Sequence, residues 1–231
     1  MDKTGNNRLF QNAAQVLTLA GEAAPRRGLV MNDLGILKDA SVLVRNGKIE
    51  WIGEDLAKVP GGIGDAEIVD CRSKVLMPGL VDSHTHLVWA GHRRDELELR
   101  LAGADYEAIF AAGGGILSSV RSTRGASDDA LYEQSLRRIQ RMRRCGTTTF
   151  EIKSGYGLDL ETEQKQLRVA RRLGKEGFRV KTTCLAAHAV PEEFKSSQAA
   201  RAAFIRDICE RILPTINDEG LADFCDVFCD R

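Results

Sequence analysis

The chain has two hydrophobic rhythms, which change near residue 78. Over residues 14–68, short runs that alternate apolar and polar residues are separated by turns, as is typical of strands with one buried face. Asn46-Gly47 lies between two such runs, and this dipeptide favours the tight turn of a β-hairpin. We therefore expect a small antiparallel β module, which makes residues 1–77 a β-rich domain.

After Pro78-Gly79 the rhythm changes to apolar strands that alternate with amphipathic helices. Strands are expected at residues 80–82, 147–152, 180–185 and 224–228. Helices are expected at residues 127–145, with Ser127 as N-cap, at about 159–177, and at 199–213, the last of them ending at Pro214. Repeated β-α units favour a parallel sheet, either in a TIM-type (β/α)8 barrel or in a doubly wound fold. Four such strands make half of a barrel, so residues 78–231 are expected to be its first half, with an open sheet edge.

Composition and charge exclude several classes of function. The 231 residues include 33 basic and 33 acidic ones, and this balance lacks the basic surface of proteins that bind nucleic acids or anionic membranes. We therefore expect a small-molecule substrate. The chain has no basic leader followed by an apolar segment and no run of eighteen apolar residues, so we expect a cytoplasmic protein without a membrane span. The arginines of residues 137–144 are expected to line a solvated helix face.

Six cysteines occur at uneven spacing without a C-x-x-C pair, at positions 71, 145, 184, 209, 225 and 229. Such spacing argues against a disulfide framework or a zinc knuckle. We expect free and mostly buried thiols. The sequence does not determine the oligomeric state, and a homodimer is compatible with it.

A pair of histidines carries the most specific chemical pattern. His84 and His86 come at the end of an apolar strand that Pro78-Gly79 introduces. Because alternate residues of a strand point to the same side, both imidazoles can bind one ion at the carboxyl end of a parallel strand. A lone His-x-His is a weak signal, but its position after this strand favours metal ligation.

Three further candidates follow the expected strands. Arg93 can hold a substrate carboxylate through its bidentate fork, although its spacing alone favours an ion pair with Asp95 or Glu96. Tyr156, between two glycines, can present its phenol to a ligand or pack in an ordinary turn. His188 ends the third strand, where it is either a catalytic residue or a satisfied core residue.

The run from Pro78 to His86 resembles the signature of the amidohydrolase superfamily. Together with residues 89–93, 151–158 and 187–191, it resembles the imidazolonepropionase family. The matching motifs span roughly residues 68–228, and the β module before them fits that family's small composite domain. Ala186 and Asp230 depart from the family, which usually has glycine and glutamate at these positions.

The resemblance implies the hydrolysis of the cyclic amide 4-imidazolone-5-propanoate to N-formimidoyl-L-glutamate, a step of histidine degradation. It implies that His84 and His86 bind one divalent or trivalent metal ion, zinc or iron. It also implies that Arg93 holds the propionate, that Tyr156 and His188 contact the imidazolone ring, and that His188 is catalytic. The family takes its remaining metal ligands and its acid-base groups from later barrel strands.

Two alternatives stay open. The chain can belong to another amidohydrolase, of the hydantoinase or deaminase type, in which Arg93 would have no carboxylate to hold. It can also be a non-catalytic product that at most binds a metal or a partner.

Overall fold

The computed structural model describes residues 7–22, 24–105, 108 and 114–229. The chain divides into two compact units, Met1–Pro78 and Gly79–Arg231, which we describe separately. The amino-terminal residues 1–6 and Asp230, both considered above, lie outside the described residues.

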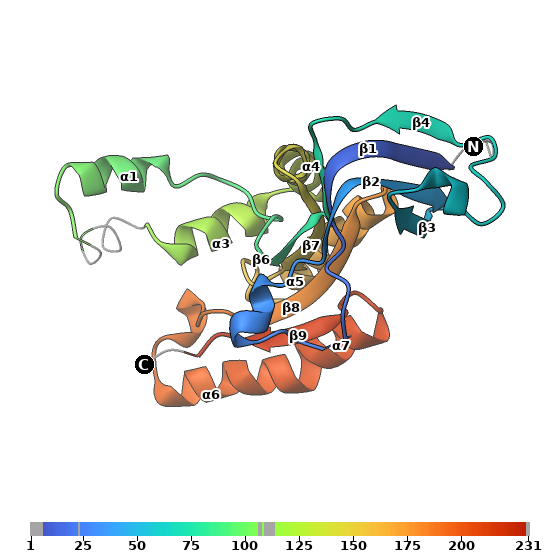
Figure 1. The fold of residues 1–231 in the computed structure, drawn as a ribbon. Coiled ribbons are helices and arrows are strands. Elements are labelled where there is room, and N and C mark those ends of the chain that lie inside the picture. Colours follow the sequence, from blue (N-terminus) through green and yellow to red (C-terminus); the bar gives the residue numbers. More distant parts are fainter. Residues whose placement is uncertain (1–6, 23, 106–107, 109–113, 230–231) are drawn as a thin grey trace. The chain divides into compact units, whose positions relative to one another are not determined.

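The first unit is built on one sheet with the strand order β3-β2-β1-β4 (Figure 1). The short strand β5 also pairs with β1. Its strands are β1 (Arg8–Leu17), β2 (Ile36–Arg45), β3 (Lys48–Gly53), β4 (Glu67–Asp70) and β5 (Val75–Leu76). Short 3₁₀ helices lie at Gly28–Asn32 (η1) and Leu56–Lys58 (η2).

The predicted hairpin is confirmed, since β2 and β3 are antiparallel and both turn residues, Asn46 and Gly47, have positive φ (50° and 74°). The expectation of a purely antiparallel module is wrong, because β4 and β5 both pair with β1 in parallel. The connection over residues 54–66 is long enough for the crossover that a parallel strand requires. The sheet also begins earlier than expected, at Arg8.

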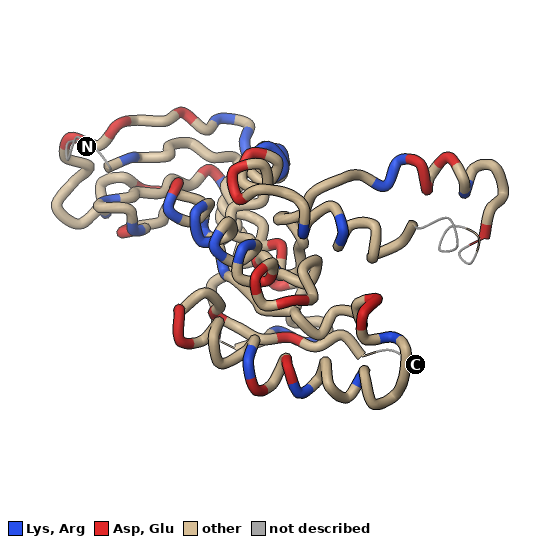
Figure 2. Tube along the Cα trace, turned by 180° about the vertical axis from the view of Figure 1, so that it is seen from behind, with Lys and Arg blue, Asp and Glu red and all other residues tan. Residues whose placement is uncertain are grey.

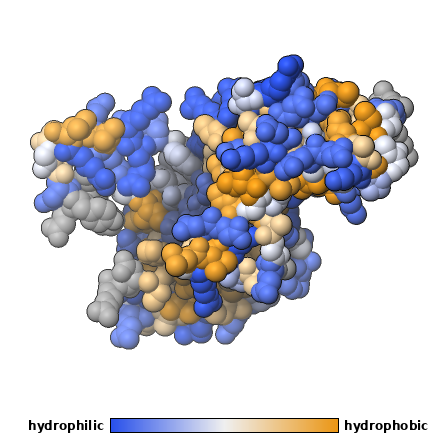
Figure 3. Space-filling model, viewed as in Figure 1, coloured by the Kyte–Doolittle hydropathy of each residue, from blue (hydrophilic) through white to orange (hydrophobic). Residues whose placement is uncertain are grey.

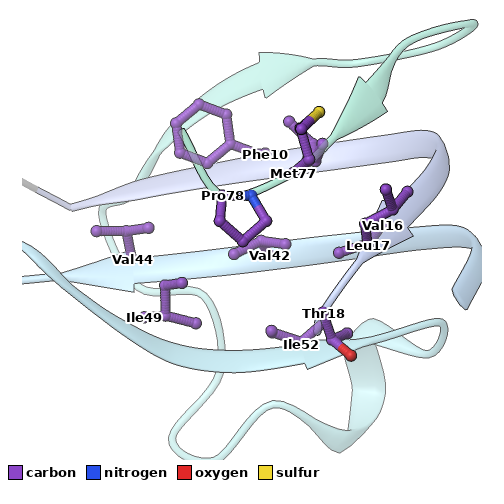
Figure 4. Close-up of a pocket in the computed structure, with 11 residues that line it drawn as sticks. Phe10, Val16, Leu17, Thr18, Val42, Val44, Ile49, Ile52, Met77 and Pro78 are labelled. Atoms are coloured by element: carbon purple, nitrogen blue, oxygen red, sulfur yellow. The ribbon is translucent and has the colours of Figure 1, made fainter. Parts of the chain in front are cut away.

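An apolar pocket of about 310 Å³ lies on this sheet (Figure 4). Side chains of β1, β2 and β3 line it together with Leu76, Met77 and Pro78. Figure 3 shows apolar side chains exposed over the first unit. Ile49, which lines the pocket, is 65% exposed. None of the described residues that line the pocket is titratable, so the pocket itself offers no acid-base chemistry.

The second unit contains a parallel sheet with the strand order β6-β7-β8-β9. Its strands are β6 (Leu80–Thr85), β7 (Thr147–Lys153), β8 (Arg179–Ala187) and β9 (Phe224–Val227), so the four predicted strands are confirmed. Its helices are α1 (Arg94–Leu101), α3 (Ile116–Gly125), α4 (Asp128–Arg144), α5 (Leu160–Lys175), 3₁₀ helix η3 (Glu192–Phe194), α6 (Gln198–Asp207), π-helix η4 (Ile208–Ile212) and α7 (Leu213–Asp218).

Side-chain caps begin the two longest helices. The Ser127 hydroxyl accepts the N–H of Ala130 (3.2 Å) and the Asp159 carboxylate accepts that of Thr162 (2.7 Å), which supplies partners for N–H groups that the first turn leaves free. The expected starts of both helices are therefore confirmed.

The expectation that a helix ends at Pro214 is wrong. The helix of α6 continues through the π turn of η4 into α7, which contains Pro214 in its first turn. Proline lacks an N–H and clashes with a carbonyl one turn earlier, and the wider π turn directly before Pro214 changes the backbone pairing there.

The core of the second unit lies between the sheet and its helices. Phe150 and Ile152 of β7 are buried in one cluster with Ile139 of α4 and Leu173 of α5. Because strand residues alternate between faces, Glu151 and Lys153 lie on the opposite face of the sheet. The helices thus leave a polar sheet face available to a site.

Two details differ from expectation. Arg138 stacks its guanidinium 4.0 Å from the centre of the Trp89 ring and donates to the carbonyl of Leu87 (2.8 Å), and burial lowers its pKa to about 10. It therefore does not belong to a solvated face. All six cysteines are free, as expected, but only Cys71 and Cys184 are buried, because the others lie on helix surfaces and at or after the edge strand β9.

Lys and Arg alternate with Asp and Glu along both units, and neither sign covers a whole unit (Figure 2). No helix among the described residues is long and apolar enough to cross a bilayer.

Candidate metal and substrate site

Four predicted site residues come together where adjacent parallel strands end. His84 lies in β6 and His86 directly follows it, while Tyr156 follows β7 and His188 follows β8. The carboxyl ends of parallel strands share one edge of the sheet. The topology therefore brings side chains together that are about a hundred residues apart in the sequence.

The four rings form a contact cluster. The ring centres of His84 and His86 are 5.6 Å apart, and the Tyr156 ring lies 5.0 Å from that of His86. The His188 ring stacks on His86 at 4.7 Å, with 10° between the planes. Phe228 packs its ring edge-on against His188 at 6.0 Å. An apolar ring thus closes one side of a polar cluster.

His86 has the properties of a metal ligand. Its Nδ1 is buried and has no hydrogen-bond partner among the described residues. Burial, and then the nearby His188 and His84, lower the pKa of His86 to about 4. The ring is therefore neutral at physiological pH, which is the form that binds metals.

The ligand set of the described residues is short. They contain no group of three or more His, Cys, Asp or Glu arranged to hold a metal ion, whereas catalytic zinc sites normally use three protein ligands. The neighbouring rings of His84 and His86 are suited to be two of these three ligands.

His188 is held by the loop that carries Tyr156. Its Nδ1 lies 2.9 Å from the carbonyl oxygen of Gly155, and a carbonyl only accepts hydrogen bonds. In the neutral ring, Nδ1 therefore carries the proton and Nε2 is an acceptor. Burial lowers the pKa of His188 and favours this neutral form.

Arg93 forms one of the ion pairs that its spacing allowed. Its Nε lies 2.8 Å from both carboxylate oxygens of Glu96, which also accepts the N–H of Gly115 (2.8 Å). Burial raises the pKa of Tyr156, and the charge of Arg93 opposes that shift. Arg93 thus acts electrostatically on the ring cluster while it is paired with Glu96.

Two side chains of α5 that the sequence analysis missed hold the Tyr156 loop. The Glu163 carboxylate accepts backbone N–H groups of this loop, and the Gln166 side chain accepts the N–H of Tyr156 (3.2 Å). The sequence shows Glu163 only as an acid near a helix start. A usable signal is the preceding Gly155-Tyr156-Gly157 turn, whose N–H groups need an acceptor.

A second missed group lies on the polar face of the sheet. Lys153 of β7 donates to Glu151 (2.6 Å) and to Asp226 of β9 (2.9 Å), and Thr183 of β8 donates to Glu151 (2.6 Å). Burial raises the pKa of Glu151, but hydrogen bonds from Lys153 and Thr183 outweigh it and hold the pKa below its ordinary value. The hydrogen bond from Lys153 likewise lowers the pKa of Asp226. This network links three strands close to the ring cluster.

Curated proteins with clear similarity cover most of the chain. It is 52% identical over 198 residues to an imidazolonepropionase from Ralstonia nicotianae, which covers 85% of this chain and 47% of the relative. It is 46% identical over 227 residues to an imidazolonepropionase from Geobacillus sp., which covers 96% of this chain and 53% of the relative. The chain thus spans about half the length of the curated relatives it matches. No family model matches the chain.

Solved structures show the same fold at low identity. An E. coli guanine deaminase aligns with a TM-score of 0.51 and 17% identity over 89% of this chain and 43% of its own. A triazine hydrolase from Arthrobacter aurescens aligns with a TM-score of 0.54 and 16% identity over 97% and 48% of the two chains. Similarity at this level shows the fold alone. By its sequence, the chain belongs to the imidazolonepropionase family and matches the amino-terminal part of its curated members.

Proposed function

We propose that this chain forms the metal-binding and ring-binding part of an imidazolonepropionase. The observation that carries the proposal is the convergence of His84, His86, Tyr156 and His188, with ring centres 4.7–5.6 Å apart between neighbours, in a chain about half identical to imidazolonepropionases. In this proposal residues 78–231 are the first half of a TIM-type barrel, and residues 1–77 are part of a composite β domain.

His84 and His86 would hold one zinc or iron ion. Such an ion, when bound, lowers the pKa of water toward 7 and polarises a carbonyl. The substrate would be 4-imidazolone-5-propanoate, in which water adds to the lactam carbonyl and the ring C–N bond breaks. With a proton delivered to the leaving nitrogen, the product is N-formimidoyl-L-glutamate.

The neighbouring side chains have matching roles. Arg93 would bind the propionate through its guanidinium, in exchange for part of its pairing with Glu96. Tyr156 keeps its proton at neutral pH, since burial raises its pKa, so its phenol can donate a hydrogen bond to the ring. His188 is proposed both to contact the imidazolone ring and to transfer a proton of that ring. Its Nε2 is an acceptor, so it can accept a hydrogen bond from a ring N–H.

A chimera tests the reaction. We would join this chain to the carboxyl-terminal half of the Geobacillus sp. relative and load it with zinc or iron. The chimera is expected to consume 4-imidazolone-5-propanoate, and His84→Ala or His86→Ala is expected to lower its activity and metal content by about 100-fold or more. A folded, metal-loaded chimera that instead opened a hydantoin or deaminated a purine would show another amidohydrolase activity.

Substitution of Arg93 tests whether this residue binds the carboxylate of the substrate. Arg93→Lys keeps the charge but loses the bidentate fork, so KM for 4-imidazolone-5-propanoate is expected to rise about tenfold while kcat changes less. Arg94→Lys, one residue further on, is the matched control and is expected to leave KM unchanged. Equal effects of the two changes would argue against a carboxylate held by Arg93.

A further inference from the structure

The loop over residues 154–158 has an unusual set of hydrogen-bond acceptors. Its four consecutive N–H groups, from Gly155 to Leu158, all end on two side chains of α5. Glu163 accepts Gly155 (3.1 Å), Gly157 (2.9 Å) and Leu158 (2.9 Å), and Gln166 accepts the remaining N–H, that of Tyr156 (3.2 Å). One helix thus fixes the whole backbone of the loop.

Burial makes this arrangement costly unless every bond is formed. Glu163 is 0% and Gln166 1% exposed, and a carboxylate taken out of water is tolerated only when it is fully hydrogen-bonded. Positive φ at Gly155 (102°) and Leu158 (57°) turns the N–H groups of the loop toward one point, as in backbone nests that bind anions. Burial raises the pKa of Glu163, and hydrogen bonds from Ser154 and the loop N–H groups oppose that shift. An ordinary turn needs no buried carboxyl group, so the arrangement indicates a position that must be held accurately.

Through the loop and the segment after His86, the same two side chains act on three of the four rings of the cluster. The loop carries Tyr156 itself, and the carbonyl of its Gly155 holds Nδ1 of His188 (2.9 Å). Gln166 also donates to the carbonyl of Val88 (2.6 Å), two residues after His86. Moving the loop would therefore shift Tyr156, release His188 and loosen the segment after His86.

We propose that Glu163 and Gln166 are positioning residues, which hold the Tyr156 loop and the Nδ1-protonated form of His188 ready for the substrate. The inference rests on the proposed function insofar as Tyr156 and His188 contact the substrate. The hydrogen-bond geometry itself does not depend on that function.

Amide hydrogen exchange in this chain tests the holding of the loop. Glu163→Gln replaces one carboxylate oxygen by a donor that faces Gly155, so exchange at residues 155, 157 and 158 is expected to accelerate about tenfold or more. Exchange in the core of α4 is expected to stay unchanged. Glu161→Gln, which makes the same substitution at an exposed position of the same helix, is the matched control, and equal acceleration in both variants would overturn the proposal.

The ¹⁵N shifts of His188 give a readout that a merely structural role would not move. The wild type is expected to show a protonated Nδ1, and Glu163→Gln a mixture of both tautomers. Gln166→Met provides the same test where Glu163→Gln does not fold, and it is expected to accelerate exchange mainly at Tyr156. An unchanged tautomer together with unchanged exchange in the folded variant would contradict the positioning role.

The chimera separates this proposal from the proposed function. There, Glu163→Gln is expected to lower kcat/KM for 4-imidazolone-5-propanoate about tenfold without loss of metal. A chimera that is inactive without any substitution would contradict the proposed function only, because exchange and tautomer measurements in this chain still decide the role of Glu163.

Discussion

No residue with a side chain can replace Gly155 without displacing the loop that carries Tyr156. The φ of Gly155 is +102°, and an added Cβ would lie 2.8 Å from the carbonyl oxygen of Leu185. Gly177 has φ +90° with nothing within 4 Å of such a Cβ. A comparison of substitutions at these two glycines therefore separates the cost of backbone strain from the cost of steric overlap.

Gly155→Ala is therefore expected to destabilise the chain more than Gly177→Ala. Both changes strain the backbone by about 1 kcal/mol, and overlap with Leu185 adds about 2 kcal/mol at Gly155. Urea unfolding of the two variants measures the difference. Equal losses of stability would show that the loop moves freely to accept a side chain.

His86 predicts a pH dependence of stability in the metal-free chain. Its folded pKa of about 4 lies below its ordinary value of 6.5, so the unfolded chain binds more protons between these values. Stability is therefore fully present above about pH 6.5 and falls as the pH drops to about 4, by roughly 3 kcal/mol. Urea unfolding between these pH values is expected to show this slope.

His86→Phe keeps a ring in place and removes the titrating group, so most of that slope is expected to disappear. His188, whose pKa burial also lowers, leaves a smaller slope of the same sign. A slope that His86→Phe did not change would show that His86 titrates at its ordinary pKa.

At the scale of elements, Lys153 connects β7 to β9 across β8. Its side chain is 7% exposed and bonds Glu151 and Asp226. Lys153→Met leaves both carboxylates without their counter-charge, and we expect a loss of about 3 kcal/mol in the free energy of unfolding at pH 7. Lys181→Met, which removes an ion pair with Asp223 from a lysine that is 56% exposed, is expected to cost under about 1 kcal/mol.

The pH dependence of this stability difference shows whether the loss comes from charge. Lys153 lowers the pKa of Glu151 and Asp226 in the folded chain, so its contribution is present above their ordinary pKa values and is lost as the pH falls through the folded values. The difference between wild type and Lys153→Met is thus expected to shrink in acid. A constant difference would assign the loss to packing rather than to charge.

These elements also show what the sequence can predict. Hydrophobic periodicity locates the strands and the long helices, and the rule for parallel strand ends places His86, Tyr156 and His188 at one edge of the sheet. Spacing alone predicts an ion pair of Arg93 with Asp95 or Glu96, and the structure selects Glu96. All of these are local patterns, or follow from the topology that local patterns imply.

The features that could not be predicted depend on backbone angles, chain paths and distant partners, which are not visible in the sequence. Glu163 acts through N–H groups whose convergence depends on the φ angles of the loop, and Lys153 through a partner 73 residues away. The parallel pairing of β4 depends on where a long connection returns. The continuation of the helix past Pro214 depends on a π turn upstream, which the sequence does not indicate.

At the scale of the whole chain, the parallel sheet of the second unit has two edge strands, each paired on one side only. Among the described residues, β6 pairs only with β7 and β9 only with β8. Val81 of β6 is 67% and Val227 of β9 64% exposed. Apolar edge strands with free backbone groups are templates for pairing with another chain, which agrees with the expected open edge of a half barrel.

This chain alone is therefore expected to self-associate through these edges. Val81→Lys with Val227→Lys should suppress association, because a charged side chain on an edge strand disfavours pairing with a second edge. Val30→Lys is the matched control, since Val30 is 60% exposed but lies in a short helix of the first unit. Sedimentation at increasing concentration measures the association. If Val30→Lys suppressed association equally, general apolar exposure rather than the strand edges would cause it. A wild type that stays monomeric and unfolds cooperatively would show that the four strands are stable without further pairing.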